Sequence, residues 1–116
     1  LHSRLFREFQ DFYHTTVDGL NDKISGYAGD VYVFGAHVFT QYLIAYGLDT
    51  NNIRGVLDND PNKQGRRLYG SALKILAPTV LRGATEPAVI LRAGVYNEEI
   101  RRDVVENYNE DTLFLG

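Results

Sequence analysis

The residues whose side chains could best bind a ligand follow an apolar run at positions 53–57. Asp58 there can accept hydrogen bonds from the hydroxyl groups of a sugar, and Lys63 offers a mobile positive charge for phosphate. Pro61 and Gly65 fix an unusual backbone path around the lysine. The combination predicts a site for a hydroxyl-rich, phosphorylated ligand, while each residue taken alone also fits an ordinary turn.

A second apolar run at 31–34 ends in Gly35 and predicts a buried strand that turns into a helix. A doubly wound nucleotide-binding unit begins with a strand, a glycine turn, a helix, a second strand and an acidic residue. This chain shows the same order. Asp58 lies roughly 20 residues beyond the glycine, where such units place the acid that meets a ribose. His37 and Thr40 occupy positions where a dinucleotide fingerprint has further glycines. Tight binding of a dinucleotide pyrophosphate over the helix start is therefore disfavoured.

Composition limits the classes of protein to consider. At 116 residues the chain is long enough for one core and too short for two. It has no cysteine, which excludes disulfides and thiolate metal sites, and its net charge of −3 gives no electrostatic case for nucleic acid. No apolar run approaches the roughly 20 residues of a membrane span. We expect a soluble, cytoplasmic domain, and the first residue, Leu1 rather than methionine, suggests excision from a larger protein.

The elements that must position these residues follow from apolar periodicity. Residues at three- and four-residue intervals predict a long first helix over 1–26, with Leu5, Phe9, Phe12, Tyr13, Val17, Leu20 and Ile24 on one face. A second helix is predicted over 36–46, ended by Gly47, and Pro78 begins a short helical turn. Apolar runs at 88–91 and 112–115 predict two more strands.

Between these last strands, Asn97 is expected to cap a helix with Glu98 and Glu99 in its first turn. Ile100, Val104 and Tyr108 would form the inner face of this helix.

Alternating strands and helices with right-handed crossovers predict an α/β, Rossmann-like three-layer domain over residues 1–116. We expect a parallel sheet in the order 3-2-1-4-5, with the first helix packed on one face and its aromatic residues, Phe9 and Phe12 included, buried. In this order the connections after strands 1 and 4 leave to opposite faces, so a crevice opens beyond the carboxyl ends of these strands. The ligand is expected there.

Three segments are expected to line the crevice, and the candidate binding residues are Gly35, Ala36, His37, Asp58, Asn59, Lys63, Gln64, Gly65, Arg92, Tyr96 and Asn97. Several have structural alternatives. His37 can cap or pack, Asp58 can cap its own turn, and Arg92 can meet an anion or pair with an acid such as Glu98 or Glu99. Tyr96 could stack on a base.

No catalytic residue is assigned. His2 and His14 are expected on solvated faces of the first helix, and no pair of histidines has metal-ligand spacing. No serine lies in a nucleophile elbow. The aromatic run Phe6, Phe9, Phe12 and Tyr13 is interpreted as core or as a domain interface.

Residues 30–100 resemble the carboxyl-terminal domain of sugar-nucleotide C-methyltransferases, enzymes of deoxysugar biosynthesis. The sharpest part is an Asp-x-x-Pro-x-Lys-Gln-Gly segment, here Asp58, Pro61, Lys63, Gln64 and Gly65. The resemblance implies that a zinc-binding amino-terminal domain and a central S-adenosylmethionine domain carry the methyl transfer. The Rossmann-like carboxyl-terminal domain then holds the nucleotide-linked sugar.

This chain has no cysteine for zinc and no room for a methyl-donor domain, so it resembles the third domain alone. The resemblance therefore implies no cofactor in this chain, no activity by this chain alone, and two partners: the nucleotide-linked sugar and the upstream methyltransferase domains. Two departures touch the crevice. Residues 92–95 precede Tyr96 and Asn97 where the family has an aromatic-Asn pair soon after its fourth strand, and Tyr69-Gly70 replaces a proline-glycine pair.

These departures leave the nucleotide and the sugar open. Two other functions stay open as well. One is a stand-alone nucleotide- or coenzyme-binding sensor on the same scaffold, because such sheets hold many ligands. The other is a structural or homo-oligomerising domain whose long aromatic helix pairs with a partner.

Overall fold

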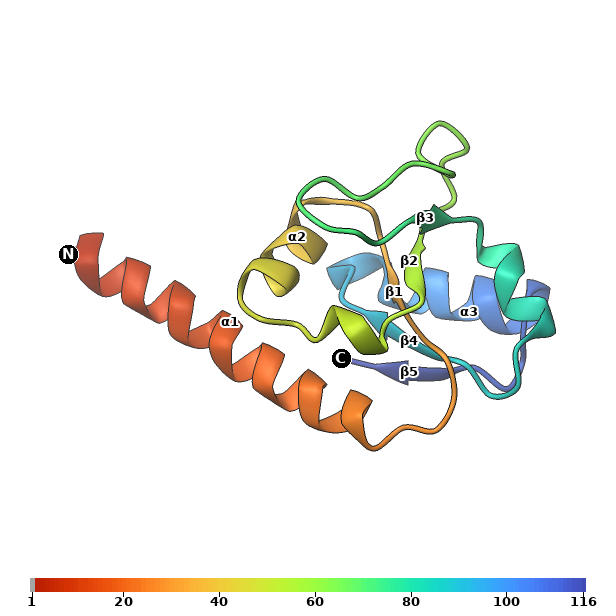
Figure 1. Cartoon of the computed structure of the whole chain (residues 1–116), viewed down its shortest axis with the longest axis horizontal. Helices are drawn as coiled ribbons and strands as arrows, with labels where there is room; N and C mark the ends of the chain where they lie inside the picture. Colours follow the sequence, from red (N-terminus) through yellow and green to blue (C-terminus); the bar gives the residue numbers. More distant parts are fainter. Residues whose placement is uncertain (1) are drawn as a thin grey trace.

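The computed structural model describes residues 2–116; Leu1 and the side chain of His2, including its expected exposure to solvent, lie outside the described part. Five parallel strands form one sheet in the order β3-β2-β1-β4-β5, which confirms the predicted topology (Figure 1). The strands are β1 (Val31–Phe34), β2 (Gly55–Leu57), β3 (Ile75–Leu76), β4 (Ala88–Leu91) and β5 (Leu113–Leu115).

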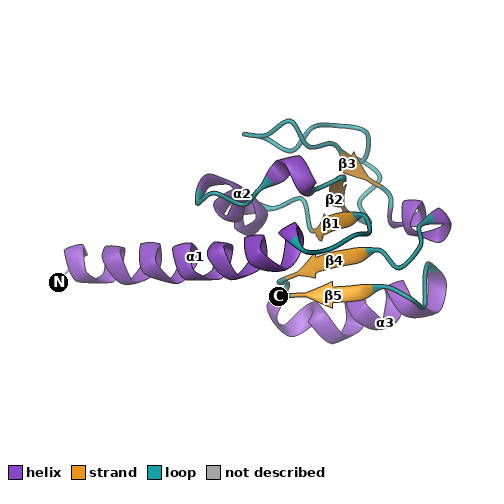
Figure 2. Cartoon of the chain, turned by 60° about the horizontal axis from the view of Figure 1, so that its bottom comes forward, coloured by secondary structure: helices purple, strands orange, loops and turns teal. Residues whose placement is uncertain are grey.

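Helices cover both faces of this sheet and give the predicted three layers (Figure 2). The α-helices are α1 (His2–Ser25), α2 (Val38–Ala45) and α3 (Asn97–Asn107), and the short 3-10 helices are η1 (Thr50–Asn52), η2 (Pro78–Gly83) and η3 (Gly94–Tyr96). The helices α1 and α2 pack on one face, while α3 and η2 pack on the other. In the described part of the chain, no helix is both long and apolar enough to cross a membrane.

The central strand β1 shows why the strand predictions succeed. Val31 and Val33 point into the core beneath α1 and α2, whereas Tyr32 and Phe34 point into the core beneath α3. Since side chains alternate between the two faces of a strand, a strand covered on both faces is apolar at every position. In β4, residues 88–91 follow the same rule.

The helix α1 divides into two halves with different surroundings. Its second half is buried against the sheet, and Leu20 there is only 3% exposed. The first half extends beyond the edge of the sheet (Figures 1 and 2). The prediction that Phe9 and Phe12 are buried is therefore wrong: they are 41% and 55% exposed. Among the aromatic residues of this helix, Tyr13 alone is buried, where its ring stacks on that of Tyr46.

The starts of two helices also differ from the prediction. Helix α2 begins at Val38 rather than at position 36, and His37 precedes it without a side-chain cap. Asn97 does not cap α3, because η3 runs directly into this helix and Asn97 already has helical backbone angles. Its side-chain oxygen instead accepts a hydrogen bond from the backbone N–H of Ala93 at 2.7 Å.

Candidate functional site

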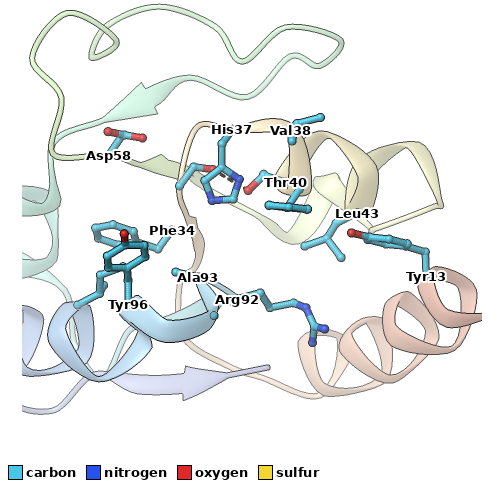
Figure 3. A pocket seen from close by; sticks show the side chains of 14 residues that line it. Tyr13, Phe34, His37, Val38, Thr40, Leu43, Asp58, Arg92, Ala93 and Tyr96 are labelled. Carbon is cyan, nitrogen blue, oxygen red and sulfur yellow. Dashed lines mark hydrogen bonds between the residues drawn. The ribbon is translucent and has the colours of Figure 1, made fainter. Parts of the chain in front are cut away.

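A cavity of about 700 Å³ lies at the carboxyl ends of β1, β2 and β4, where the crevice was expected (Figure 3). Five of the predicted residues line it: Gly35, His37, Asp58, Arg92 and Tyr96. We call this cavity the carboxyl-edge pocket. Its other lining residues are Tyr13, Phe34, Val38, Phe39, Thr40, Leu43, Ala93, Gly94 and Ile100.

The turn after β1 is held in an unusual conformation by Gly35. Its φ of +108° lies in the region that side chains rarely adopt, and a Cβ atom at this position would overlap the imidazole of His37. The backbone N–H of Gly35 donates to the carbonyl of Leu57 at 2.7 Å. The glycine is thus required by the chain itself, before any ligand is considered.

Asp58 connects this turn to the end of β2. One carboxylate oxygen accepts a hydrogen bond from the N–H of Ala36 at 2.9 Å. The other accepts from the N–H of Asp60, also at 2.9 Å, so the carboxylate caps its own turn as the structural alternative predicted. Asp58 also lines the carboxyl-edge pocket, and the two roles coexist.

Most of the remaining candidates in the 58–65 turn do not line the pocket and instead donate hydrogen bonds to backbone carbonyls. The ammonium of Lys63 donates to the carbonyl of Ala36 at 3.1 Å. The side-chain amide of Gln64 donates to the carbonyl of Asp58 at 2.8 Å, and the N–H of Gly65 donates to Ile75 at 2.8 Å. Asn59 is exposed. Ala36, Asn59, Lys63, Gln64, Gly65 and Asn97 are not among the residues that line the pocket.

The structure alters the ionisation of two pocket residues: burial raises the pKa of the Tyr13 hydroxyl and lowers that of the His37 imidazole. Burial lowers the pKa of His37 below the usual 6.5; the nearby carboxylate of Asp58 opposes this change and the ammonium of Lys63 adds to it. The imidazole is therefore neutral at pH 7. Its Nδ1 atom is buried and has no hydrogen-bond partner within residues 2–116.

Arg92 reaches the pocket from the end of β4. Its guanidinium donates to the backbone oxygen of Gly116 at 3.3 Å and lies 5.8 Å from the centre of the Phe12 ring. The predicted alternative, a pair with Glu98 or Glu99, is wrong: Glu98 lies 3.7 Å from Arg101 instead. Within residues 2–116 no Asp or Glu side chain forms an ion pair with Arg92.

Two kinds of pocket residue were missed from the sequence. Thr40 is 1% exposed, and its hydroxyl donates to the carbonyl of Gly35 at 2.6 Å. Its position near the glycine turn, within the first turn of the helix, was the available signal. The apolar residues Val38 and Phe39 are exposed at the start of α2, and Tyr13 comes from α1. Nothing local in the sequence connects Tyr13 to this pocket.

The five-stranded parallel sheet and its carboxyl-edge pocket define a Rossmann-like α/β domain. Residues 3–115 match the family described as C-methyltransferase C-terminal domain, and the chain belongs to that family. This confirms the resemblance found in the sequence. A comparison with curated proteins found no match, and neither did a comparison with solved structures.

The resemblance implies zinc in another domain of the parent protein and not in this chain. The sequence has no cysteine, and residues 2–116 bring no three His, Asp or Glu side chains together as a metal site. The turn after β1 has Gly35 alone, covered by His37, and is not a glycine-rich methyl-donor loop. No step of methyl transfer is therefore assigned to residues of this chain.

Proposed function

We propose that this domain holds a nucleotide-linked sugar in the carboxyl-edge pocket while a separate domain, with S-adenosylmethionine as donor, transfers the methyl group in deoxysugar biosynthesis. The observation that carries the proposal is the position and size of the pocket. It lies at the switch point between β1 and β4, and about 700 Å³ is within the range of small-molecule sites. Membership in the C-methyltransferase family supplies the class of reaction.

The lining of the pocket suits such a ligand. Phe34, Phe39 and Tyr96 offer aromatic surface on which a base can stack. The carboxylate oxygens of Asp58 each accept one hydrogen bond from the protein and keep a lone pair for a sugar hydroxyl. The neutral imidazole of His37 can donate or accept as well.

The exposed half of α1 supports a partner domain as the second component of this function. The exposed rings of Phe6, Phe9 and Phe12 form an aromatic surface, and two of them contact the buried ring of Tyr13, which lines the pocket. We propose that the methyltransferase domain docks on this surface, because the reacting sugar must lie within reach of the methyl donor.

Sedimentation velocity of the chain alone tests this docking proposal. A dimer that dissociates on Phe6→Ser substitution would assign the surface to a second copy and contradict the docking proposal.

A thermal-shift screen of nucleoside diphosphate sugars, dinucleotides and coenzyme A tests the binding function. A ligand at a hundredfold excess over its dissociation constant adds about 2.7 kcal/mol to the free energy of unfolding. We expect this stabilisation from a nucleoside diphosphate sugar. Stabilisation by coenzyme A or a dinucleotide alone would support the sensor function instead, and no stabilisation by any of these compounds would contradict both.

A further inference from the structure

In the turn that binds phosphate in many nucleotide-binding domains, the N–H of Ala36 is already bonded here to a side chain of the protein. Such turns present free backbone N–H groups to the ligand. In this chain the carboxylate of Asp58 accepts a hydrogen bond from the N–H of Ala36 at 2.9 Å. The hydroxyl of Thr40 donates a hydrogen bond to the carbonyl of Gly35, and the ammonium of Lys63 donates one to the carbonyl of Ala36. A phosphate approaching Ala36 would meet a carboxylate of its own sign.

The opposite wall of the pocket carries a cation with which no Asp or Glu side chain of residues 2–116 forms an ion pair. Among the lining residues, Arg92 is the one side chain with a permanent positive charge. A guanidinium has five N–H donors, and the described contacts of Arg92 are the Gly116 oxygen and the face of the Phe12 ring. The residue is half-buried beside apolar groups. A contact between this guanidinium and an anion is charge-assisted and therefore stronger than a hydrogen bond between neutral groups.

We propose that Arg92 is the anion-binding group of the carboxyl-edge pocket and takes a diphosphate on the β4 wall. A hydroxyl-bearing part of the same ligand then lies against Asp58 and His37. Figure 3 shows Arg92 extending toward Tyr13 on α1, away from Asp58. The diphosphate therefore lies on the α1 side of the pocket and not over the turn at Gly35. Only the identity of the whole ligand rests on the proposed function; the anion subsite does not.

Lys63 is the competing cation, and its contacts argue against it. Its ammonium donates to the carbonyl of Ala36, and the residue does not line the pocket. It lies close enough to His37 to influence the charge of that imidazole, and the carboxylate of Asp58 does the same with opposite sign. The ammonium of Lys63 is therefore already engaged within the turn.

Titration of the ¹⁵N-labelled chain with inorganic pyrophosphate at constant ionic strength tests the subsite without a sugar nucleotide. We expect shifts in the amide signals of residues 92–96 and 12–13, and little change at 35–38. Arg92→Gln should weaken pyrophosphate binding at least about tenfold, the effect of losing a charged hydrogen-bonding contact. Arg92→Lys, which keeps the charge but not the bidentate fork, should lose less.

Arg82→Gln is the matched control. Arg82 also donates to a backbone carbonyl, that of Asn107, and lies over a ring, that of Tyr108, but it does not line the pocket. This variant should bind pyrophosphate as the wild type does. Three results would overturn the proposal: shifts centred on residues 35–38, loss of binding in Lys63→Gln with none in Arg92→Gln, or no pyrophosphate binding to the wild type. Pyrophosphate binding at Arg92 with no binding of nucleoside diphosphate sugars would leave the subsite standing and remove the proposed function.

Discussion

Asp58 links the ends of two neighbouring strands through its two carboxylate oxygens. One bond fixes the turn after β1 and the other fixes the turn after β2. The pocket wall is thereby formed before any ligand arrives, which lowers the conformational cost of binding. At the scale of single residues, the polar groups around Gly35 act as a preorganised frame.

Replacing Asp58 with alanine should therefore destabilise the fold. Two backbone N–H groups lose a charged acceptor, and the expected loss in the free energy of unfolding is about 1–3 kcal/mol. Urea denaturation measures it. Asp58→Asn keeps one acceptor oxygen and should lose less. Asp111→Ala, the same change at an exposed position, should stay within about 0.5 kcal/mol of the wild type; equal losses in Asp58→Ala and Asp111→Ala would contradict the framing role.

His37 should make the stability of the fold depend on pH. Burial lowers its pKa in the folded state below the unfolded value of 6.5, so the unfolded state binds the proton more readily. Stability from the neutral imidazole is complete above pH 6.5 and is lost as the pH falls through the folded-state pKa. Urea denaturation at about pH 7.5 and about pH 5.5 should show a smaller decrease in His37→Gln than in the wild type. Equal decreases would show that the imidazole does not carry this effect.

At the scale of elements, the apolar stripe of α1 serves two different environments. Its second half belongs to the core with α2 and the sheet, and its first half lies beyond the sheet. The helix is continuous, and its second half is buried whereas its first half makes only partial contacts, such as those of the Phe9 ring with Tyr42 and Tyr46. An apolar helical face shows where burial is favourable without showing what covers it.

Two leucines of α1 measure this difference. Leu20→Ala should lower the free energy of unfolding by about 2–5 kcal/mol, because it leaves a cavity in the core. Leu5 is 56% exposed, and Leu5→Ala should change stability by no more than about 0.5 kcal/mol. Thermal or urea denaturation of both variants decides the matter. A large loss in Leu5→Ala would mean that the first half of α1 is covered in solution.

The sequence was sufficient for four of the five strands, but it did not locate β3 (Ile75–Leu76) or the contacts between distant segments. The strands at 31–34 and 88–91 were predicted to the residue, because strands buried on both faces leave uninterrupted apolar runs. The position of Asp58 in the pocket lining followed from its place after β2. Its bond to Ala36 and the entry of Tyr13 into the pocket depend on tertiary packing, which local patterns do not encode.

At the scale of the whole molecule, the chain is a compact α/β body with a projecting helix, and it measures 47 × 32 × 27 Å. The carboxyl-edge pocket lies between the sheet, α2 and α3, and Tyr13 connects it to α1 near the start of the projecting half. This arrangement places the proposed ligand site beside the proposed docking surface. A domain docked there would cover the mouth of the pocket.

Because the methyl donor belongs in this account to another domain, the chain alone should transfer no methyl group. Incubation with S-adenosylmethionine and a panel of nucleoside diphosphate sugars, followed by mass spectrometry, should show unmodified sugars. A methylated sugar formed by this chain alone would contradict the assignment of methyl transfer to another domain.

The central claim is that the carboxyl-edge pocket binds a nucleotide-linked sugar, and filling the pocket tests it most directly. Ala93 lines the pocket, whereas Ala72 is exposed elsewhere on the surface. Calorimetric titration with the best nucleoside diphosphate sugar should give equal affinities for the wild type and Ala72→Phe. Ala93→Phe, with its fold checked by circular dichroism, should bind at least about tenfold more weakly, a loss of about 1.4 kcal/mol. Undiminished affinity in a folded Ala93→Phe protein would contradict the account.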